Sequence, residues 1–297
     1  MNVPASIDVS LVVATYEWPE ALDLVLMALS DQSDTRFDVV VADDGSGHAT
    51  RAVVERWHGT FRGRLVHARQ SDVGYRRARS LNLGVLSATG SYLVFLDGDC
   101  LPRRRFVEAV RRAALPGWFL ASKRLNMSAR LSRRVLEEQV PVWRWSALRW
   151  LLTAPREVFT APREIGRPGL LLPVRDRRRP WRPGQPEFVP PFDGYGFFFG
   201  VGRDDLERVN GVDMRFTGWG GEDVDLATRL RRTGLKCGWP GAQSTVLHLW
   251  HPERKGGMTS NAGLVRETAA SARVGAVEGL RELARELEVE KSQAGSS

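Results

Sequence analysis

The sequence predicts an α/β fold in which a mostly parallel sheet carries helices on both faces. Short β-branched runs alternate with stretches of helical periodicity, as expected for repeated strand–helix units. The runs are apolar throughout, which is typical of strands that are buried on both faces. Hydrophobic residues make up 42% and charged residues 26% of the 297 residues, so the chain can bury a substantial core. One elaborated domain is compatible with this length.

The first part of the chain follows this alternation. A helix is expected after the first strand, because Pro19 suits a first helical turn and apolar residues follow it at helical spacing. The expected strands span residues 9–14, 37–42, 64–68 and 92–96, and the expected helices span residues 19–29, 50–57 and 76–87.

Polar residues occur where these strands end. Thr15, Asp43 and Asp44 follow the first two strands, and Asp97 and Asp99 follow the fourth. In sheets of this kind, ligands bind at the carboxyl ends of the strands. The sequence therefore predicts an acidic edge on the sheet.

The pattern changes at residue 123. Residues 123–191 are basic and rich in Trp and Pro, with consecutive arginines at residues 177–179, and we interpret them as an insertion. Regular patterns return afterwards and end in an amphipathic closing helix beyond residue 262. We therefore divide the chain into residues 1–122, 123–191, 192–261 and 262–297.

The elements expected after the insertion are shorter than those before it. They are a strand at residues 197–201, a helix near 204–209, a Gly-rich loop at 211–221, a helix at 222–233 and a strand at 244–249.

Charge and cysteine content restrict the partners and the compartment. The net charge of +8 favours anionic partners, but nucleic acid does not explain an acidic edge, because clustered carboxylates repel phosphates unless a metal intervenes. Cys100 and Cys237 are far apart and lack zinc-ligand spacing, which fits a reducing compartment. The sequence shows no signal peptide and no apolar run of spanning length. We expect a cytoplasmic protein whose contact with an anionic membrane would be peripheral, at the inner face.

Asp97, Gly98 and Asp99 are the first candidate site. When a nucleoside diphosphate leaves a sugar, its negative charge must be stabilised, and a divalent cation bridging phosphate oxygens does this. Carboxylates are the hard ligands that such a cation prefers, and glycine lets a phosphate approach the backbone. His248 and His251 could complete the shell of Mn²⁺, which tolerates nitrogen. The alternatives are a solvated turn at a strand end and two structural histidines.

Residues 218–225, Gly-Trp-Gly-Gly-Glu-Asp-Val-Asp, are the second candidate site. Trp219 offers a flat face on which a sugar ring can stack. An inverting transfer needs a carboxylate base near the acceptor hydroxyl, and Asp223 is the candidate for that base. The alternative is that Glu222 and Asp223 only complement a helix N-terminus. Asp225 is expected to pair with the arginine four residues on.

These segments together resemble the family 2 glycosyltransferases, which have the Rossmann-like GT-A fold. Residues 12–16, 39–46 and 90–99 are similar to three successive landmarks of that family, in the family's order. Residues 200–230 are similar to the acceptor-side segment of β-1,4-galactosyltransferases and bacterial chondroitin polymerases. The resemblance covers roughly residues 8–121 and 195–255.

The resemblance implies an inverting, metal-dependent glycosyltransferase. It would move a hexose or N-acetylhexosamine from a UDP-sugar to a glycan or lipid-linked glycan in surface polysaccharide or lipopolysaccharide synthesis. Residues 1–122 would bind the donor, and residues 192–261 would bind the acceptor and carry the catalytic base Asp223. The metal, Mn²⁺ or Mg²⁺, would be held by Asp97, Asp99, His248 and His251. The acceptor would contact Trp219, Gly220 and Glu222, and the donor would contact Ala14, Thr15, Asp43, Asp44, Arg76, Arg79, Asn82, Asp97 and Gly98.

Three departures from the family pattern affect what can be carried over. Leu81 occupies a position where many relatives have arginine, so Arg76 or Arg79 would have to supply that charge. Val224 replaces an aspartate that holds the acceptor in galactosyltransferases, so the acceptor is not copied from them. The Trp/Arg-rich insertion could be packing with solvated charge, a lid over the acceptor site, or a patch for an anionic membrane or lipid-linked glycan.

Two other functions remain open at the level of sequence. A nucleotide-sugar binding protein without turnover would need Asp97 and Asp99 but not Asp223. A nucleotidyltransferase also needs two aspartates and a metal, although residues 14–18 are not the Gly-rich loop that it would be expected to carry after the first strand.

Overall fold

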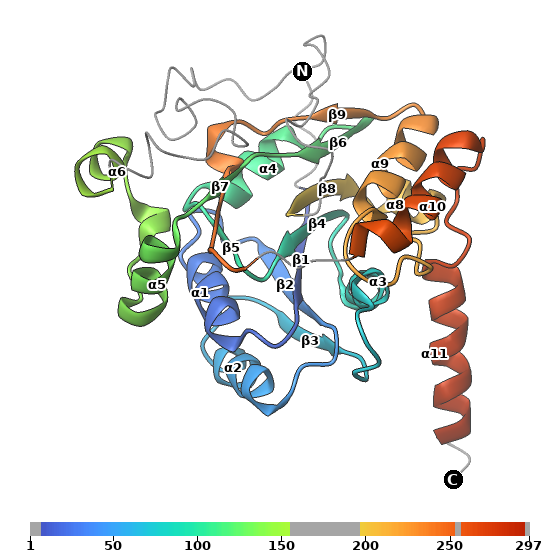
Figure 1. The fold of residues 1–297 in the computed structure, drawn as a ribbon, viewed down its shortest axis with the longest axis horizontal. Helices are drawn as coiled ribbons and strands as arrows, with labels where there is room; N and C mark the ends of the chain where they lie inside the picture. Colours follow the sequence, from blue (N-terminus) through green and yellow to red (C-terminus); the bar gives the residue numbers. More distant parts are fainter. Residues whose placement is uncertain (1–6, 155–196, 253–256, 295–297) are drawn as a thin grey trace.

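The large sheet forms the centre of the protein. The computed structural model describes residues 7–154, 197–252 and 257–294. Seven strands pair in the order β3-β2-β1-β4-β8-β6-β9 (Figure 1). Their bounds are β1 Val9–Thr15, β2 Phe37–Asp43, β3 Leu65–Arg69, β4 Tyr92–Asp97, β6 Trp118–Ala121, β8 Phe198–Gly202 and β9 Lys236–Gly238.

The expected parallel arrangement is confirmed for most of this sheet. β3, β2, β1 and β4 run parallel to one another, and β6 runs parallel to β9. β8 is antiparallel to both of its neighbours, β4 and β6. All seven residues of β2 are buried, as expected for a strand that is covered on both faces.

A second sheet of three short strands brings distant segments together. It consists of β5 (Cys100–Pro102), β10 (Val246–His248) and β7 (Arg124–Asn126), with β10 in the middle. In the antiparallel pairing of β10 with β5, His248 lies opposite Cys100. The C-terminal half of the chain is thereby held against the residues that follow β4.

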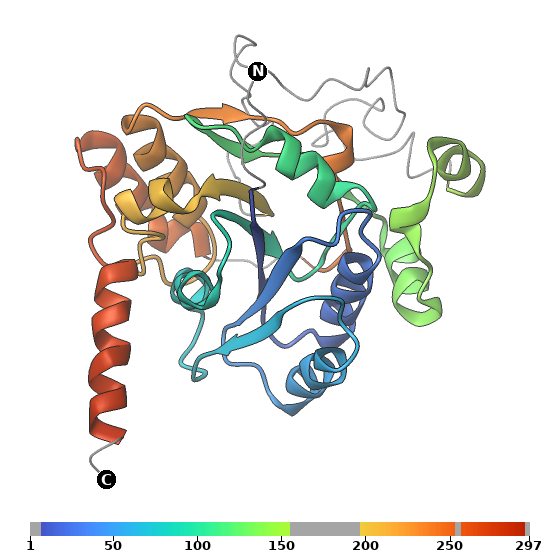
Figure 2. The ribbon, with the colours of Figure 1, turned by 180° about the vertical axis from the view of Figure 1, so that it is seen from behind.

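Helices cover both faces of the large sheet, as predicted (Figures 1 and 2). One core cluster joins one face of the strands to α1, α2 and α4, and the other joins the opposite face to α3, α8 and α9. Pro19 lies at the first position of α1, as its sequence context predicts. The helices are α1 Pro19–Ser30, α2 His48–His58, α3 Arg77–Ser87, α4 Phe106–Ala113, α5 Ala129–Glu138, α6 Ala147–Thr153, α8 Arg203–Arg208, α9 Glu222–Arg232, α10 Gly257–Ala270 and α11 Leu280–Ala294, with 3-10 turns at Val142–Arg144 and Ala242–Ser244.

The first part of the expected insertion is regular structure. Residues 123–154 contain β7, α5 and α6, and their tryptophans Trp143, Trp145 and Trp150 are buried in the core. These three tryptophans therefore serve packing, which was the plainest of the three interpretations. Residues 155–191, including the arginines at 177–179, lie outside the described residues.

Helix α9 is fixed to the rest of the fold by a buried ion pair. The side chains of Arg229 and Asp225 are both fully buried and approach to 2.7 Å, which confirms the pairing expected from their spacing. Arg229 also donates to the carbonyls of Val209 and Gly211, and Asp225 accepts a hydrogen bond from Thr268 of α10. This network joins α9 to the loop before it and to α10.

We predict that Arg229→Met lowers the free energy of unfolding by about 3 kcal/mol, because Asp225 would keep a buried charge without its main partner. Urea denaturation measures this change. Arg134→Met is the matched control, since Arg134 pairs with Glu138 at the same helical spacing but both side chains are more than half exposed. That control should change stability by less than about 0.5 kcal/mol. Equal losses in the two variants would contradict the prediction.

Candidate active site

The turn that follows β4 is built against the end of β1. The backbone N–H of Gly98 donates to the carbonyl of Ala14 at 2.7 Å. A Cβ at position 98 would lie 2.7 Å from that oxygen and 3.3 Å from the Thr15 side chain, so this close approach requires glycine. Four of the predicted donor residues, Ala14, Thr15, Asp97 and Gly98, therefore lie at one edge of the sheet.

Asp99 lies against both predicted histidines. Its Oδ2 is 3.7 Å from Nε2 of His248 and 3.4 Å from Nε2 of His251, and the two imidazole rings lie 5.1 Å apart. The backbone supports this approach, because the N–H of Leu249 donates to the Asp99 carbonyl at 2.9 Å. The ligand atoms of Asp99, Cys100 and His248 all lie within 4.8 Å of one another.

The chemistry of these side chains fits a divalent cation. Burial lowers the pKa of His248 to about 4, so its imidazole is neutral and offers a lone pair at physiological pH. Burial raises the pKa of the Cys100 thiol, which donates to Asp99 and is a poor ligand while it keeps its proton. One carboxylate and two imidazoles suit Mn²⁺, which accepts both oxygen and nitrogen. Asp99, His248 and His251 are therefore the residues that could hold the metal, with Asp97 beside them.

Arg77 is a residue of this site that the sequence did not single out. Its Nη2 lies 2.5 Å from Oδ1 of Asp97, and its Nη1 lies 2.8 Å from Oε1 of Glu222. Burial opposes the charge of Arg77, but the two carboxylates raise its pKa above the ordinary value, so it stays protonated. Arg77, rather than Arg76 or Arg79, thus brings a guanidinium to Asp97. Helical spacing could have indicated it, because Arg77 lies one turn before Leu81 and both line the same pocket.

Arg76, Arg79 and Asn82, the donor residues predicted in this segment, contact different parts of the fold. The backbone N–H of Arg76 donates a hydrogen bond to the Asp44 carboxylate, and its Nη2 donates to the Ser71 carbonyl. Arg79 bonds to Gln70 and to Glu286 of α11, and both amide atoms of Asn82 bond to the backbone of Val212. The structure does not bring the Arg79 and Asn82 side chains to Asp97. Contacts of Arg79 and Asn82 with a nucleotide-sugar therefore stay predictions, which their hydrogen bonds in this structure do not support.

Asp43 and Asp44 are buried at the end of β2. Oδ1 of Asp43 accepts from the N–H groups of Gly45 and Ser46, and its Oδ2 lies 2.8 Å from Nε2 of His67. Burial favours protonation of Asp43, but the hydrogen bonds from His67 and Ser46 outweigh it and lower the pKa. For Asp44 burial dominates and raises the pKa. The Asp44 N–H donates to the Thr15 carbonyl, which fixes this loop next to the end of β1.

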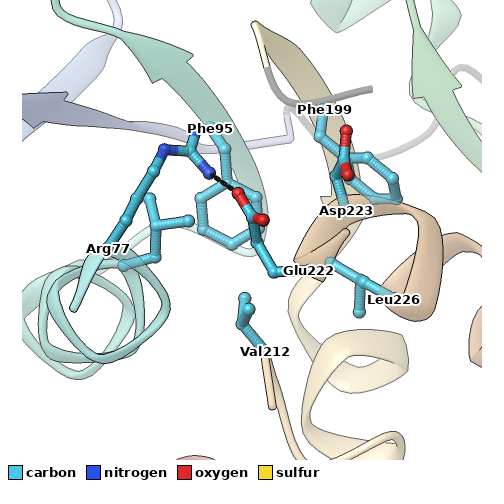
Figure 3. Close-up of a pocket in the computed structure, with 8 residues that line it drawn as sticks. Arg77, Phe95, Phe199, Val212, Glu222, Asp223 and Leu226 are labelled. Carbon is cyan, nitrogen blue, oxygen red and sulfur yellow. Dashed lines mark hydrogen bonds and ion pairs between the residues drawn. The ribbon is translucent and has the colours of Figure 1, made fainter. Parts of the chain in front are cut away.

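A pocket lies between the first turns of α3 and the start of α9. Most of the residues that line it are apolar, and its charged residues are Arg77, Glu222 and Asp223. Figure 3 shows the Glu222 carboxylate turned toward Arg77, with Asp223 on the other side, near Phe199. Burial raises the pKa of Glu222, and its Oε2 has no hydrogen-bond partner among the described residues. The pocket is lined by Arg77, Leu81, Phe95, Phe199, Val212, Glu222, Asp223 and Leu226.

The loop before α9 presents the remaining predicted acceptor residues. Gly221 precedes the helix with φ of 99°, a conformation that favours glycine, and so directs Glu222 and Asp223 into the first helical turn. Trp219 is 47% exposed, so it can offer a ring face to a ligand. The Gly220 carbonyl accepts from Asn261 of α10, which holds the loop in place.

Two family models match the chain. The glycosyl transferase family 2 model matches residues 10–117, and the model described as the N-terminal domain of galactosyltransferase matches residues 186–252. The first covers the edge with Asp97 and Asp99, and the second covers the loop of Trp219 with Glu222, Asp223 and the strand of His248.

Curated proteins are also similar to this chain. A validoxylamine A glucosyltransferase of Streptomyces hygroscopicus subsp. jinggangensis is 30% identical over 236 residues, which is 76% of this chain and 52% of the relative. A chondroitin synthase of Pasteurella multocida is 31% identical over 108 residues, which is 36% of this chain and 11% of the relative. The chain thus spans about half the length of the first of these relatives.

Solved structures show the same fold. A mannosyltransferase from Pyrobaculum calidifontis, PcManGT, in complex with GDP-Man and Mn²⁺, superposes with a TM-score of 0.54 at 18% identity, over 97% of this chain and 76% of that chain. Residues 1–349 of TarS from S. aureus superpose with a TM-score of 0.51 at 13% identity, over 82% of this chain and 60% of that chain. Residues 10–117 therefore match the family 2 glycosyltransferases, residues 186–252 match the galactosyltransferase model, and the chain has the GT-A fold.

Proposed function

We propose that the protein is an inverting, metal-dependent glycosyltransferase that moves a hexose or N-acetylhexosamine from a UDP-sugar to a glycan or lipid-linked glycan. One observation carries the proposal. The Asp99–His248–His251 cluster and the Arg77–Asp97 pair lie at the carboxyl edge of the sheet, and Arg77 joins this edge to Glu222 beside Asp223. Donor-side and acceptor-side groups thus meet at one place.

The donor edge supplies the groups that a nucleotide diphosphate needs. Asp99, His248 and His251, with Asp97, would hold Mn²⁺ or Mg²⁺, and imidazole ligands favour Mn²⁺ over Mg²⁺. When bound, the cation would offset the negative charge that develops on the departing diphosphate. The loops after β1 and β2, with Thr15, Asp43 and Asp44, are the proposed place of the uridine.

Asp223 is the proposed catalytic base. Its carboxylate lies in the first turn of α9 and lines the pocket. Glu222 is less suited to the role, because it is buried and its Oε1 is bonded to Arg77. In the proposed step, Asp223 takes the proton of the acceptor hydroxyl as that oxygen attacks the anomeric carbon and the UDP oxygen leaves from the opposite side.

The acceptor site and the setting of the reaction are proposed from the loop and the surface. Trp219 would stack against an acceptor sugar, with Gly220 and Glu222 beside it. Val224 provides no carboxylate for the acceptor, so we propose a glycan or lipid-linked acceptor in surface polysaccharide or lipopolysaccharide synthesis without copying that of galactosyltransferases. Because one relative is named a validoxylamine A glucosyltransferase, validoxylamine A belongs in the acceptor panel.

A peripheral membrane contact of a cytoplasmic enzyme is part of this proposal. None of the helices in the described residues has the length and apolar character of a membrane span. Helix α6 instead exposes Leu148 and Leu152, at 64% and 72%, next to the exposed Arg149. Apolar and basic side chains together on an exposed helix are typical of contact with an anionic lipid surface. Both ribbon views place α6 at the opposite end of the molecule from α11 (Figures 1 and 2).

We predict that Asp223→Asn lowers the rate of sugar transfer by about 10³-fold, since a positioned base contributes 10²- to 10⁴-fold. The rate is measured as UDP release in the presence of Mn²⁺, a panel of UDP-sugars and acceptors, while UDP affinity should stay unchanged. Asp204→Asn is the matched control, because Asp204 is also an acidic residue in the first turn of a helix, α8, but is exposed. It should keep full activity.

Three outcomes would contradict the proposed function. Full transfer activity in Asp223→Asn would show that Asp223 is not the catalytic base. UDP binding without transfer across the whole panel would favour a nucleotide-sugar binding protein. Turnover with GDP-sugars alone would contradict the UDP-sugar donor.

We predict that His248→Ala and His251→Ala each weaken Mn²⁺ binding by about tenfold or more, because each removes one ligand. Titration calorimetry with Mn²⁺ and UDP measures the affinity. Removal of divalent cations with EDTA should abolish UDP release, and added Mn²⁺ should restore it. His58→Ala changes an exposed histidine at the end of α2 and should leave both properties unchanged. Normal Mn²⁺ affinity in both active-site variants would refute this assignment of the ligands.

We predict that the double variant Leu148→Ser/Leu152→Ser loses most of its binding to vesicles that contain anionic lipid, because the apolar contact area is removed. Co-sedimentation with phosphatidylglycerol-containing and neutral vesicles measures binding. Val289→Ser on α11 is the control, since Val289 is 55% exposed at the opposite end of the molecule. Equal binding of the double variant and the wild type would exclude α6 as the contact.

A further inference from the structure

The guanidinium of Arg77 is shared between two carboxylates from different parts of the chain. Asp97 ends β4 on the donor side, and Glu222 begins α9 on the acceptor side. Each carboxylate is bonded to a different nitrogen, Nη2 for Asp97 and Nη1 for Glu222. One of the two bonds can therefore be given up while the other is kept.

Asp97 is directed to Arg77 although it belongs to the edge that would hold the metal. The compact group of potential metal ligands in the described residues is Asp99, Cys100 and His248, with His251 at 3.4 Å from Asp99. The Oδ1 of Asp97 lies 2.5 Å from Arg77 instead. A divalent cation held by Asp97 would lie close to a second positive charge, and like charges repel strongly where water is scarce. Arg77 and the cation therefore compete for Asp97.

The pocket offers Arg77 a different partner once a donor is bound. Only 13% of the Arg77 side chain is exposed, and it lies at the first position of the 11-residue helix α3, whose N-terminus also favours negative charge. A guanidinium donates strong, charge-assisted hydrogen bonds to phosphate oxygens. The diphosphate of a donor would approach this edge together with the cation.

A second observation indicates that the pocket is completed by a ligand. Oε2 of Glu222 is buried and has no hydrogen-bond partner among the described residues, while Oε1 is bonded to Arg77. A buried oxygen without a donor costs free energy, which a ligand hydroxyl would recover. Arg77 holds this carboxylate so that its second oxygen lies at the pocket (Figure 3).

Building on the proposed function, we propose that Arg77 is a donor-binding residue that changes partner. Without donor it holds Asp97 and Glu222 together. When the nucleotide-sugar binds with its cation, the hydrogen bond from Nη2 of Arg77 to Asp97 is replaced by one to the diphosphate. The hydrogen bond from Nη1 to Glu222 is kept. Asp97 is then available to contact the cation, and the same guanidinium keeps the Glu222 carboxylate oriented. Arg77 thereby links occupancy of the donor site to the arrangement of the acceptor site.

The test compares two binding constants that the exchange moves in opposite directions. In Arg77→Gln, Mn²⁺ without nucleotide should bind about tenfold more tightly, because Asp97 has lost its competitor, and UDP in the presence of Mn²⁺ should bind about tenfold more weakly. Electron paramagnetic resonance of free Mn²⁺ measures the first constant, and calorimetry measures the second. Arg77→Lys keeps the charge but not the two-nitrogen fork, so its UDP affinity should lie between those of the glutamine variant and the wild type.

Arg111→Gln is the matched control. Arg111 is 11% exposed and pairs with Asp34 at 2.7 Å, remote from the pocket-lining residues, so its loss tests the effect of breaking a part-buried ion pair. Both binding constants should stay at the wild-type values in this variant. Arg77→Gln constants that both stay unchanged, or that move in the same direction, would overturn the exchange.

The proposed function and the exchange fail in different ways. A wild-type protein that binds Mn²⁺ and UDP but transfers no sugar contradicts the proposed function, while the opposite movement of the two constants still supports the exchange. A wild-type protein that binds neither Mn²⁺ nor UDP overturns both. In an active protein, Arg77→Gln should raise the KM for the donor.

Discussion

The parallel register of β1 between β2 and β4 is the constraint on which the site depends. Ala14 pairs with Ala42 on one side and with Asp97 on the other, so the three strands end at the same level. Their backbone groups then join the loops, since Gly98 donates to Ala14 and Asp44 donates to Thr15. Because all three loops leave the sheet together, the carboxylates that follow the strands are held at one edge.

This edge concentrates negative charge, and the structure balances it in two ways. Arg77 is bonded to Asp97 and Glu222, and its protonation is secured by both. Around Asp99 the partners are imidazoles, and the buried His248 is neutral because burial lowers its pKa. A charged guanidinium beside Asp97 and imidazoles beside Asp99 make Asp99 the carboxylate that is better suited to an added cation.

The second half of the fold supplies a frame that fixes helix α9. The buried pair of Arg229 and Asp225 fixes the middle of α9, and Asp225 extends the network to α10 through Thr268. Asp213, in the preceding loop, pairs with Arg215 and Arg273. Its burial favours protonation, but the hydrogen bonds from Arg215 and from the N–H of Val277 outweigh it and lower the pKa of Asp213. With its middle and its preceding loop fixed, α9 can present Glu222 and Asp223 to the pocket at a constant position. Figure 2 shows this packing of α9 with α10 from behind.

The sequence by itself determined the strand–helix alternation, the aspartates at the strand ends and the pairing of Asp225 with Arg229. Each of these depends on neighbours within a few residues, where periodicity and turn chemistry are readable. The three-residue strands β5, β7 and β10 are too short for periodicity, so their pairing, which places His248 opposite Cys100, came only from the tertiary structure. The contact of Arg77 with Glu222, 145 residues apart, likewise depends on how two helices pack on the sheet. Contacts across such separations are set by the packing of the whole chain, and that is why the sequence named Asp97 and Glu222 as site residues but not the arginine that joins them.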